Sequence, residues 1–384
     1  MGLRVLLLTR YGRTGASRRL RFLQYLAGLD EYEIDVHPAP FLDDVYLKEL
    51  YDGRRPSLGR VFAFYSERLH YLVKAREFDV VWVEKEVLPW VPGWVERSVL
   101  GSLPLVFDFD DAWHLRYSRS PNPLVRWTLG KKLERMARRA DFVIVANKFL
   151  QSWAEDAGAK SVTCIPTVVD LRRYPQTALP AAEPFTIGWI GTPETAPYLD
   201  TIKGALKQVL AREGTRLLLV GADPSFLPLP NVETPWSEAR EANLLQRMHV
   251  GIMPLPQGAW EYGKSGYKLV QYMAASRPVV ASPVGVNCDV VKEGVNGFFA
   301  ITEEEWIANL ERFRGNIGLT SALGAAARQT VEESFSLRAT VPKIAEILLS
   351  AAATRRPSRR KLARSSFKPD LARSAASNDA APSR

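Results

Sequence analysis

The sequence predicts an α/β protein with two doubly wound, Rossmann-like domains that face a central cleft. Short apolar runs of strand length recur along the chain, with helical patterns between them. This alternation is typical of mostly parallel sheets covered by helices on both faces. It stops once, in a segment rich in Pro, Ala and Arg at 171–184, and then restarts. A chain of 384 residues is long enough for two such domains.

The expected elements follow one another in regular order on both sides of that linker. Strands are expected at Leu3–Leu8, Ile34–His37, Val80–Val83, Leu105–Phe107, Phe142–Val145, Phe185–Ile190, Arg216–Val220, Val250–Met253 and Pro278–Ala281. Helices are expected at 17–28, 57–76, 88–99, 121–139, 147–157, 196–212, 238–247 and 265–275. Ligands of such sheets bind outside the carboxyl ends of the strands, so the cleft between the domains is the expected site.

The net charge of +9 belongs mainly to the C-terminal end of the chain. From Arg355 onward nine residues are basic and two are acidic, which leaves about +2 for everything before them. The segment 354–384 has few large apolar residues, so we expect a disordered basic tail. The folded part is not expected to bind nucleic acid.

Cysteine spacing and hydropathy bear on the cellular compartment. Cys164 and Cys288 lie far apart and outside any C-x-x-C spacing, which fits a reducing compartment without disulfides. The first apolar run is too short for a signal peptide, and no run approaches the roughly 20 residues needed to span a bilayer. We therefore expect a cytoplasmic protein.

One expected helix has two contrasting faces. At about 100° per residue over 123–140, apolar residues share one side and basic residues share the other. The basic residues are Lys131, Lys132, Arg135, Arg138 and Arg139. The apolar side is expected to pack on the sheet, and the basic side is either solvated or a patch for an anionic membrane surface. The 57–76 helix, which mixes aromatic and basic residues, poses the same choice.

The loop after the first strand is a first candidate for ligand binding. Gly12 and Gly15 permit a tight turn beside a ligand. Ser17 is a candidate N-cap for the following helix, whose free N–H groups would point into the cleft. The alternative is an ordinary strand–helix connection that needs small residues.

Acidic residues follow two expected strands. Glu84 ends one of them, and Asp110, Asp111 and His114 follow another. Side chains that project toward one cleft suit a general base or the binding of sugar hydroxyls, so these four are candidate catalytic residues. The D-x-D-D string is also a candidate metal site. Alternatively, an Asp caps the next helix and His114 is a packed histidine beside Trp113.

The most informative stretch is a Gly- and Lys-containing loop that opens an amphipathic helix. Gly263 and Gly266 let the backbone approach a ligand closely. Lys264 and Lys268 supply positive charge, and the helix adds the positive end of its dipole. A loop of this chemistry suits a negatively charged group such as a diphosphate.

The same stretch carries a family resemblance. Residues 263–299 read GKSGYKLVQYMAASRPVVASPVGVNCDVVKEGVNGFF. They resemble the donor-binding half of the retaining, nucleotide-sugar-dependent glycosyltransferases of group 1, with its Gly-rich loop, helix, E-Y/A-M-A-x-G-x-P-V-V-A-S and G-x-N-G-F. The stretches LLLTRYGRTGASRRLRFLQYL, VVWVEKEVLPW, VFDFDDAWH and FTIGWIGTPETAPYL also resemble a subgroup of bacterial surface-polysaccharide enzymes. The resemblance covers about residues 3–350.

The resemblance implies the GT-B architecture and a reaction. An acceptor-side domain at 1–170 would precede the 171–184 linker, a nucleotide-sugar-binding domain at 185–336, and a helix at 337–353 that crosses back to the first domain. A sugar would move with retention from a UDP- or GDP-sugar to a glycan or lipid-linked acceptor. Neither a metal nor another cofactor is implied, because basic residues and helix N-termini stabilise the leaving diphosphate.

The resemblance also assigns the donor site. The donor would be held by Gly15, Gly191, Thr192, Gly263, Lys264, Ser265, Gly266, Lys268 and Gln271. After the strand at 185–190 the family often carries Arg and a downstream Lys, which this chain lacks at those positions. The diphosphate would therefore rest on Lys264 and Lys268, or on Arg18 and Arg19.

Two glutamates of the family motif are missing. They match Gly263 and Gln271 here. Gln271 keeps an acceptor oxygen for the ribose hydroxyls but loses the charge, and Glu261 is a nearby substitute for the other carboxylate. The lost glutamates keep a second hypothesis open, a non-catalytic GT-B scaffold in polysaccharide assembly. A nucleotide-sugar epimerase of the same architecture is the third.

Overall fold

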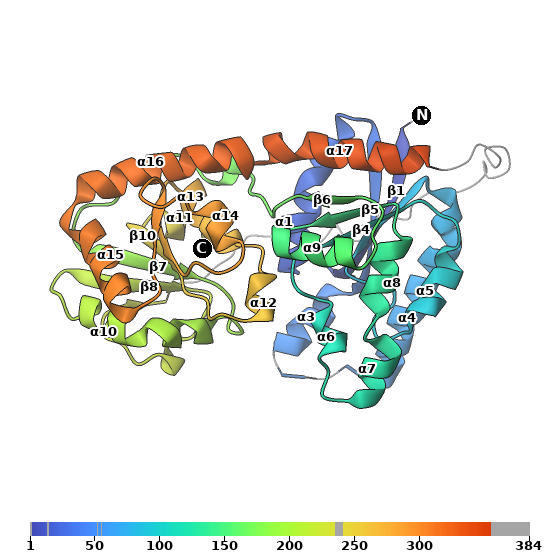
Figure 1. Ribbon diagram of the computed structural model, residues 1–384, viewed down its shortest axis with the longest axis horizontal. Helices are drawn as coiled ribbons and strands as arrows, with labels where there is room; N and C mark the ends of the chain where they lie inside the picture. Colours follow the sequence, from blue (N-terminus) through green and yellow to red (C-terminus); the bar gives the residue numbers. More distant parts are fainter. Residues whose placement is uncertain (1, 14, 52, 55, 235–240, 355–384) are drawn as a thin grey trace, which may run out of the picture.

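The computed structural model describes residues 2–13, 15–51, 53, 54, 56–234 and 241–354, and it contains two α/β domains side by side (Figure 1). The chain passes between the domains twice, and the two passages pair at an isolated bridge between Val169 and Ser336. The tail predicted from 354 onward lies outside the described residues, apart from Thr354 at the end of the last helix. Within the described part no helix is long and apolar enough to cross a membrane.

The first domain is built on a six-stranded parallel sheet in the order β2-β1-β3-β4-β5-β6. The strands are Leu3–Tyr11 (β1), Ile34–Leu42 (β2), Val80–Glu84 (β3), Leu105–Phe109 (β4), Phe142–Val145 (β5) and Val162–Cys164 (β6). The α-helices are Ala16–Arg21 (α1), Leu26–Asp30 (α2), Asp44–Tyr51 (α3), Leu58–Lys74 (α4), Gly93–Leu100 (α5), Leu115–Ser118 (α6), Pro123–Leu129 (α7), Lys132–Arg139 (α8) and Lys148–Asp156 (α9).

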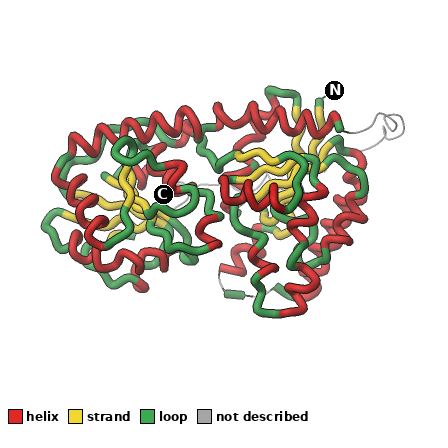
Figure 2. Tube along the Cα trace, in the orientation of Figure 1, coloured by secondary structure: helices red, strands yellow, loops and turns green. Residues whose placement is uncertain are grey.

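Side chains of β1 divide between two layers of helices. Leu6 and Leu8 join a core with residues of α4, α5, α8 and α9. Val5 and Leu7 point to the other face, where they pack with α2 and the last helix of the chain. This period of two is what a strand buried on both faces requires, and Figure 2 shows the helices on both sides of the strands.

The second domain repeats the plan with the strand order β12-β11-β10-β7-β8-β9, again all parallel. Its strands are Phe185–Ile190 (β7), Thr215–Val220 (β8), Val232–Glu233 (β9), Val250–Met253 (β10), Val279–Ala281 (β11) and Gly297–Phe299 (β12). Its helices are Ala196–Ile202 (a 3-10 helix, η4), Lys203–Leu210 (α10), Glu241–Leu245 (α11), Ala259–Tyr262 (α12), Tyr267–Ala274 (α13), Asn287–Val290 (α14), Glu303–Gly315 (α15) and Ile317–Ser334 (α16). Helix Leu337–Ala353 (α17) follows them in the chain.

The last two helices run along both domains (Figure 1). Helix α16 packs against α13 in the second domain, whereas α17 contacts α2 and strands β1, β3 and β4 of the first. Ile344, Leu348 and Ala351 of α17 are buried in the first domain's core. The C-terminal end of the described chain therefore completes the N-terminal domain.

The sequence pattern predicted the fold class correctly. Some individual strands and helices differ from those expected. All nine expected strands are present, but β6, β9 and β12 were missed because each is only two or three residues long. The helix expected at 121–139 is broken at Gly130 into α7 and α8. Lys132 was expected on the basic outer face of that helix, and this prediction is wrong, because Lys132 is 1% exposed.

Candidate active site

The two domains meet where the carboxyl ends of the first sheet face the loop before α13. The Asn147 amide nitrogen, at the start of α9, donates to the Lys264 carbonyl oxygen at 2.8 Å and to the Tyr262 carbonyl oxygen at 3.3 Å. The Lys264 ammonium lies 3.9 Å from the Asp111 carboxylate of the first domain. The predicted acidic residues and the predicted Gly/Lys loop are thus brought together where the two domains meet.

Gly263 forms the closest part of this meeting. A Cβ atom placed on Gly263 would lie 2.5 Å from the Ala112 Cβ and 2.7 Å from the Ala112 backbone nitrogen. No side chain fits into that space without a shift of the backbone, so the glutamate of the family motif has no room here. The missing carboxylate is explained by the closeness of the two domains.

On the first-domain side, a buried lysine links the predicted carboxylates. The Lys85 ammonium lies 3.1 Å from the Asp110 carboxylate and 3.7 Å from the Glu84 carboxylate. It also donates to the Ser17 hydroxyl at 3.3 Å. Lys85 is 6% exposed and Asp110 is 8% exposed. Lys85 is not among the site residues predicted from the sequence.

Charges in this cluster shift one another's pKa. Burial alone would lower the pKa of Lys85, but the carboxylates of Asp110 and Glu84 raise it above the usual range. Burial favours the neutral form of Asp110, yet Lys85 and then Arg21 lower its pKa. The pKa of Asp111 is raised by burial and by Asp110. Asp110 is therefore ionised at neutral pH. Asp111 binds a proton more readily than an ordinary aspartate.

Glu84 is occupied with the loop that follows β1. One of its oxygens accepts from the Arg10 backbone N–H at 2.9 Å, and the other accepts from the Ser17 hydroxyl at 2.7 Å. Ser17 therefore does not cap α1 as predicted, and Gly15 is the residue at the cap position. A Cβ on Gly15 would lie 2.6 Å from the Tyr11 Cβ, so this turn needs a glycine. Glu84 positions the loop beside Asp110.

His114 is packed among aromatic rings. Its imidazole stacks on the Trp153 ring at a centroid distance of 4.4 Å and lies near Phe149. Burial, followed by the charge of Arg119, lowers its pKa to about 4. His114 is thus neutral near pH 7, and its surroundings correspond to the packed-histidine alternative.

On the second-domain side, Lys268 is a cation without a counter-ion. Its ammonium donates to the Thr195 hydroxyl at 3.0 Å and lies 4.0 Å from the centre of the Trp189 ring. A Cβ on Gly191, just beyond β7, would lie 2.5 Å from the same ammonium nitrogen. Within the described residues no carboxylate forms an ion pair with Lys268. Burial, and then Lys264, lower its pKa to about 7.

Three further residues of the predicted donor site lie in the loops that follow β7 and precede α13. Gly266 has a φ of +66°, which favours glycine, and no side chain caps α13 at this position. Ser265 is half-buried in the same loop. Thr192 is exposed, and its carbonyl oxygen accepts from the Thr195 backbone N–H at 2.9 Å. Lys268 therefore stands in the first turn of α13, next to the uncapped N-terminus of that helix.

Gln271 and Glu261 stand near the positions of the missing glutamates. The buried Gln271 amide donates to the Tyr174 hydroxyl at 3.3 Å and to the Glu241 carboxylate at the start of α11. Glu261 accepts from the Tyr198 hydroxyl at 2.6 Å. Glu241 restores a carboxylate beside Gln271. No motif in the sequence indicated this pairing, because 30 residues separate the two.

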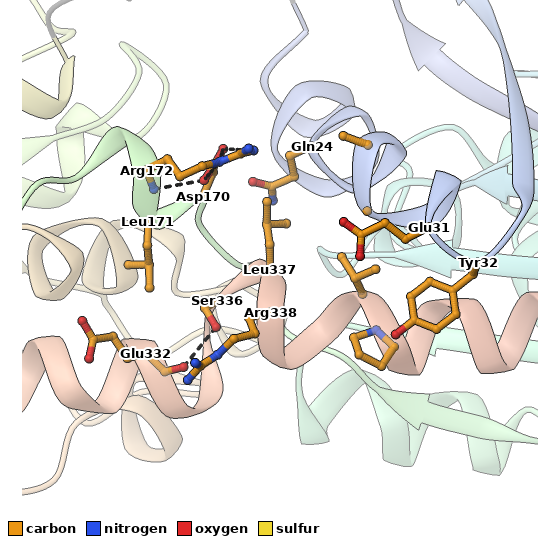
Figure 3. Close-up of a pocket in the computed structure, with 14 residues that line it drawn as sticks. Gln24, Glu31, Tyr32, Asp170, Leu171, Arg172, Glu332, Ser336, Leu337 and Arg338 are labelled. Atoms are coloured by element: carbon orange, nitrogen blue, oxygen red, sulfur yellow. Dashed lines mark hydrogen bonds and ion pairs between the residues drawn. The ribbon is translucent and has the colours of Figure 1, made fainter.

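A cavity lies beside the two passages of the chain between the domains. Its volume is about 780 Å³, and it contains none of the predicted site residues. It is lined from α2, from the passage at Asp170–Arg172 and from the start of α17 (Figure 3). Among the residues that the structure describes, no group of three His, Cys, Asp or Glu side chains is arranged to hold a metal ion.

Two Rossmann-like domains with charged residues gathered where they meet define a protein of the GT-B class. Residues 20–173 match the family described as Glycosyltransferase Family 4, and residues 184–316 match the family described as Glycosyl transferases group 1. The matches fall one on each domain, and the chain belongs to these glycosyltransferases. No curated protein sequence matches it.

Solved structures share the fold at low sequence identity. Anabaena Alr3699/HepE in complex with UDP-glucose has a TM-score of 0.68 and 18% identity over 91% of this chain and 100% of that chain. Sucrose-phosphate synthase from Thermosynechococcus elongatus has a TM-score of 0.67 and 14% identity, with 92% and 100% covered. WaaG, a glycosyltransferase involved in lipopolysaccharide biosynthesis, has a TM-score of 0.63 and 15% identity, with 90% and 99% covered. These likenesses confirm the GT-B fold.

Proposed function

We propose that this protein transfers a sugar from a UDP- or GDP-sugar to a glycan or lipid-linked acceptor, with retention and without a metal. The observation that carries the proposal is the Lys268 ammonium, which has no carboxylate partner and lies against Gly191 beside the open N-terminus of α13. The neighbouring Lys264 lies 3.9 Å from the Asp111 carboxylate of the first domain. A cationic pocket that faces carboxylates suits a diphosphate joined to a sugar.

The charged residues of the two domains would have different roles in the reaction. Lys268, Lys264 and the α13 N-terminus would stabilise the negative charge that develops on the leaving diphosphate. Asp110, kept ionised by Lys85, would accept hydrogen bonds from hydroxyl groups of the sugar or the acceptor. Asp111, whose pKa is raised, would take up the acceptor's proton.

Two of the solved structures support the classes of donor and acceptor. HepE has been crystallised with UDP-glucose and with UDP and glucose, and WaaG acts in lipopolysaccharide biosynthesis. By analogy, we propose a nucleotide-sugar donor and an acceptor in a cell-surface polysaccharide or glycolipid for this chain. We further propose that the reaction takes place on the cytoplasmic side of a membrane.

A two-stage experiment tests the proposal. A thermal-shift panel of nucleotide sugars first identifies the donor, because a ligand that binds only the native state raises its stability. The donor is then incubated with cell-envelope extracts as acceptor, and products are compared for the wild type, Asp110→Asn, Lys268→Ala and the exposed control Lys207→Ala. We expect labelled sugar on an acceptor together with free nucleoside diphosphate in the wild type and the control only.

The other hypotheses give different products. An isomeric nucleotide sugar formed without acceptor would identify an epimerase. A donor that binds without any turnover in any extract would favour the non-catalytic scaffold. Transfer that survives in Lys268→Ala would reject the assignment of the diphosphate to this lysine.

A further inference from the structure

The outward face of α4 is an exposed apolar stripe. Leu58, Phe62, Leu69 and Val73 fall within about 60° of one another at 100° per residue. Their side chains are 87%, 73%, 44% and 77% exposed. An exposed apolar stripe of this kind marks a surface that binds a protein partner or a membrane.

The basic residues of α4 do not interrupt the stripe. Arg60 forms ion pairs with Asp43 at 2.7 Å and with Glu49 at 2.6 Å. Arg68 is buried and donates to two backbone carbonyl oxygens. Arg60 and Arg68 are therefore bound to other residues of the first domain, and the four apolar side chains of the stripe face outward.

A basic groove lies next to α4 in the same layer of helices. Helices α4, α5 and α8 pack in this order on one face of the first sheet, because their strands follow one another in the sheet. The groove between α5 and α8 has a volume of about 610 Å³ and is lined by Trp94, Arg97, Arg135, Arg138 and Lys160, among others. Trp94 is 65% exposed.

The cations of this groove are only partly neutralised. Asp141 is the one carboxylate in its lining, and it pairs with Arg139 at 3.8 Å and Lys160 at 3.6 Å. Neither Arg97 nor Arg135 forms an ion pair within the described part of the chain. These two guanidinium groups are available to an anion.

Helix α7, which leads into α8, adds a second aromatic anchor. Trp127 is 83% exposed and Leu124 is 63% exposed. The segment 115–139 contains eight basic residues and a single acidic one, Glu134. Exposed tryptophan among arginines is typical of groups that sit at the boundary between water and lipid.

We propose that the outer surface of α4, α5, α7 and α8, here called the docking face, binds a lipid bilayer that contains anionic lipids. The apolar stripe and the two tryptophans would enter the headgroup region, and the groove would receive headgroup phosphates. Figure 1 shows α4 and α5 on the side of the first domain away from the second, so the cleft stays accessible. The inference stands independently of the transferase activity.

Charge argues against other occupants. A second copy of the chain would bring Arg97 and Arg135 against like charges. Thr354 lines the groove. The sequence after Thr354 contains nine basic and two acidic residues, so it is no counter-ion for the groove. A nucleic acid would match the arginines but not the aliphatic stripe of α4.

Cosedimentation of the full chain with vesicles tests the docking face. The lipids are phosphatidylcholine alone, or with about 30 mol % phosphatidylglycerol, in buffers of low and high salt. Phe62→Ser/Val73→Ser removes apolar surface, and Arg97→Glu/Arg135→Glu reverses charge. The matched controls lie elsewhere on the surface, at Val295→Ser/Ile301→Ser and Lys207→Glu/Lys343→Glu. A UDP thermal shift on every variant verifies that the fold is intact.

We expect the wild type to bind anionic vesicles, more weakly at high salt, and to ignore pure phosphatidylcholine. Each docking-face variant should lower the partition coefficient at least about fivefold, whereas both controls should bind like the wild type. Equal binding by all five proteins would assign adhesion to the basic tail and overturn the proposal. Absence of wild-type binding would overturn it as well and would point to an acidic protein partner.

Discussion

At the scale of single residues, Lys268 determines how the cleft responds to an anion. Burial and the neighbouring Lys264 lower its pKa to about 7, so at pH 8 the free protein holds it largely neutral. A bound diphosphate favours the charged form and raises this pKa again. We therefore expect protonation of Lys268 to be coupled to binding of the proposed nucleotide donor.

This coupling predicts proton uptake when UDP binds at pH 8. UDP itself is fully ionised at that pH, so the proton is taken from the buffer by Lys268. Affinity should accordingly fall as the pH rises above about 7. Calorimetry in buffers of different ionisation enthalpy measures the uptake, which Lys268→Met should abolish and the exposed control Lys207→Met should keep. Equal uptake by both variants would contradict the assignment.

The first-domain cluster shows what a residue pattern can and cannot predict. Glu84, Asp110 and Asp111 were identified from their position after strands, and the structure brings them to the cleft. Lys85 was missed because alternate residues of a strand point to opposite faces, which would separate it from Glu84. Lys85 has a φ of 61°, and this left-handed turn directs its ammonium to Asp110. Such a turn has no reliable signature in a single sequence.

At the scale of elements, one broken helix changes the environment of a charge. A continuous helix over 123–140 would place Lys132 outside, but the break at Gly130 turns it inward. Its ammonium lies 2.9 Å from the Glu86 carboxylate and 3.1 Å from the Glu96 carboxylate. Lys132 thus joins α8 to α5 and to the loop after β3. Helical periodicity predicts the faces of an element only where the element is continuous.

Removal of this link should destabilise the first domain. Lys132→Met leaves Glu96 buried without a cation, and a broken buried ion pair costs about 3–5 kcal/mol of unfolding free energy. Lys131→Met, at the exposed neighbouring position, should change it by less than about 0.5 kcal/mol. Urea denaturation of both variants measures the difference. Similar midpoints for the two would show that the pair contributes little.

At the scale of the whole molecule, Gly263 sets the distance between the domains. Gly263→Ala introduces a Cβ atom within 3 Å of three Ala112 atoms, so the domains must separate slightly. Because a shift of about 1 Å can cost 10²-fold in rate, sugar transfer should fall at least tenfold. Gly315→Ala, where a Cβ meets nothing within 4 Å, is the control. Unchanged transfer by Gly263→Ala would mean that this contact does not position the site.

The last helix makes the stability of the first domain depend on the far end of the chain. Leu348 of α17 is fully buried in the core that includes β1, β3 and β4, whereas its neighbour Leu349 is 46% exposed. Leu348→Ala should therefore lower the unfolding free energy by about 2–5 kcal/mol, and Leu349→Ala by less than about 0.5 kcal/mol. Hydrogen exchange should report the loss in strands β1, β3 and β4 of the first domain, more than 200 residues away in sequence. If the second domain's strands lost protection instead, α17 would belong to that domain's cooperative unit and the first domain would fold without it.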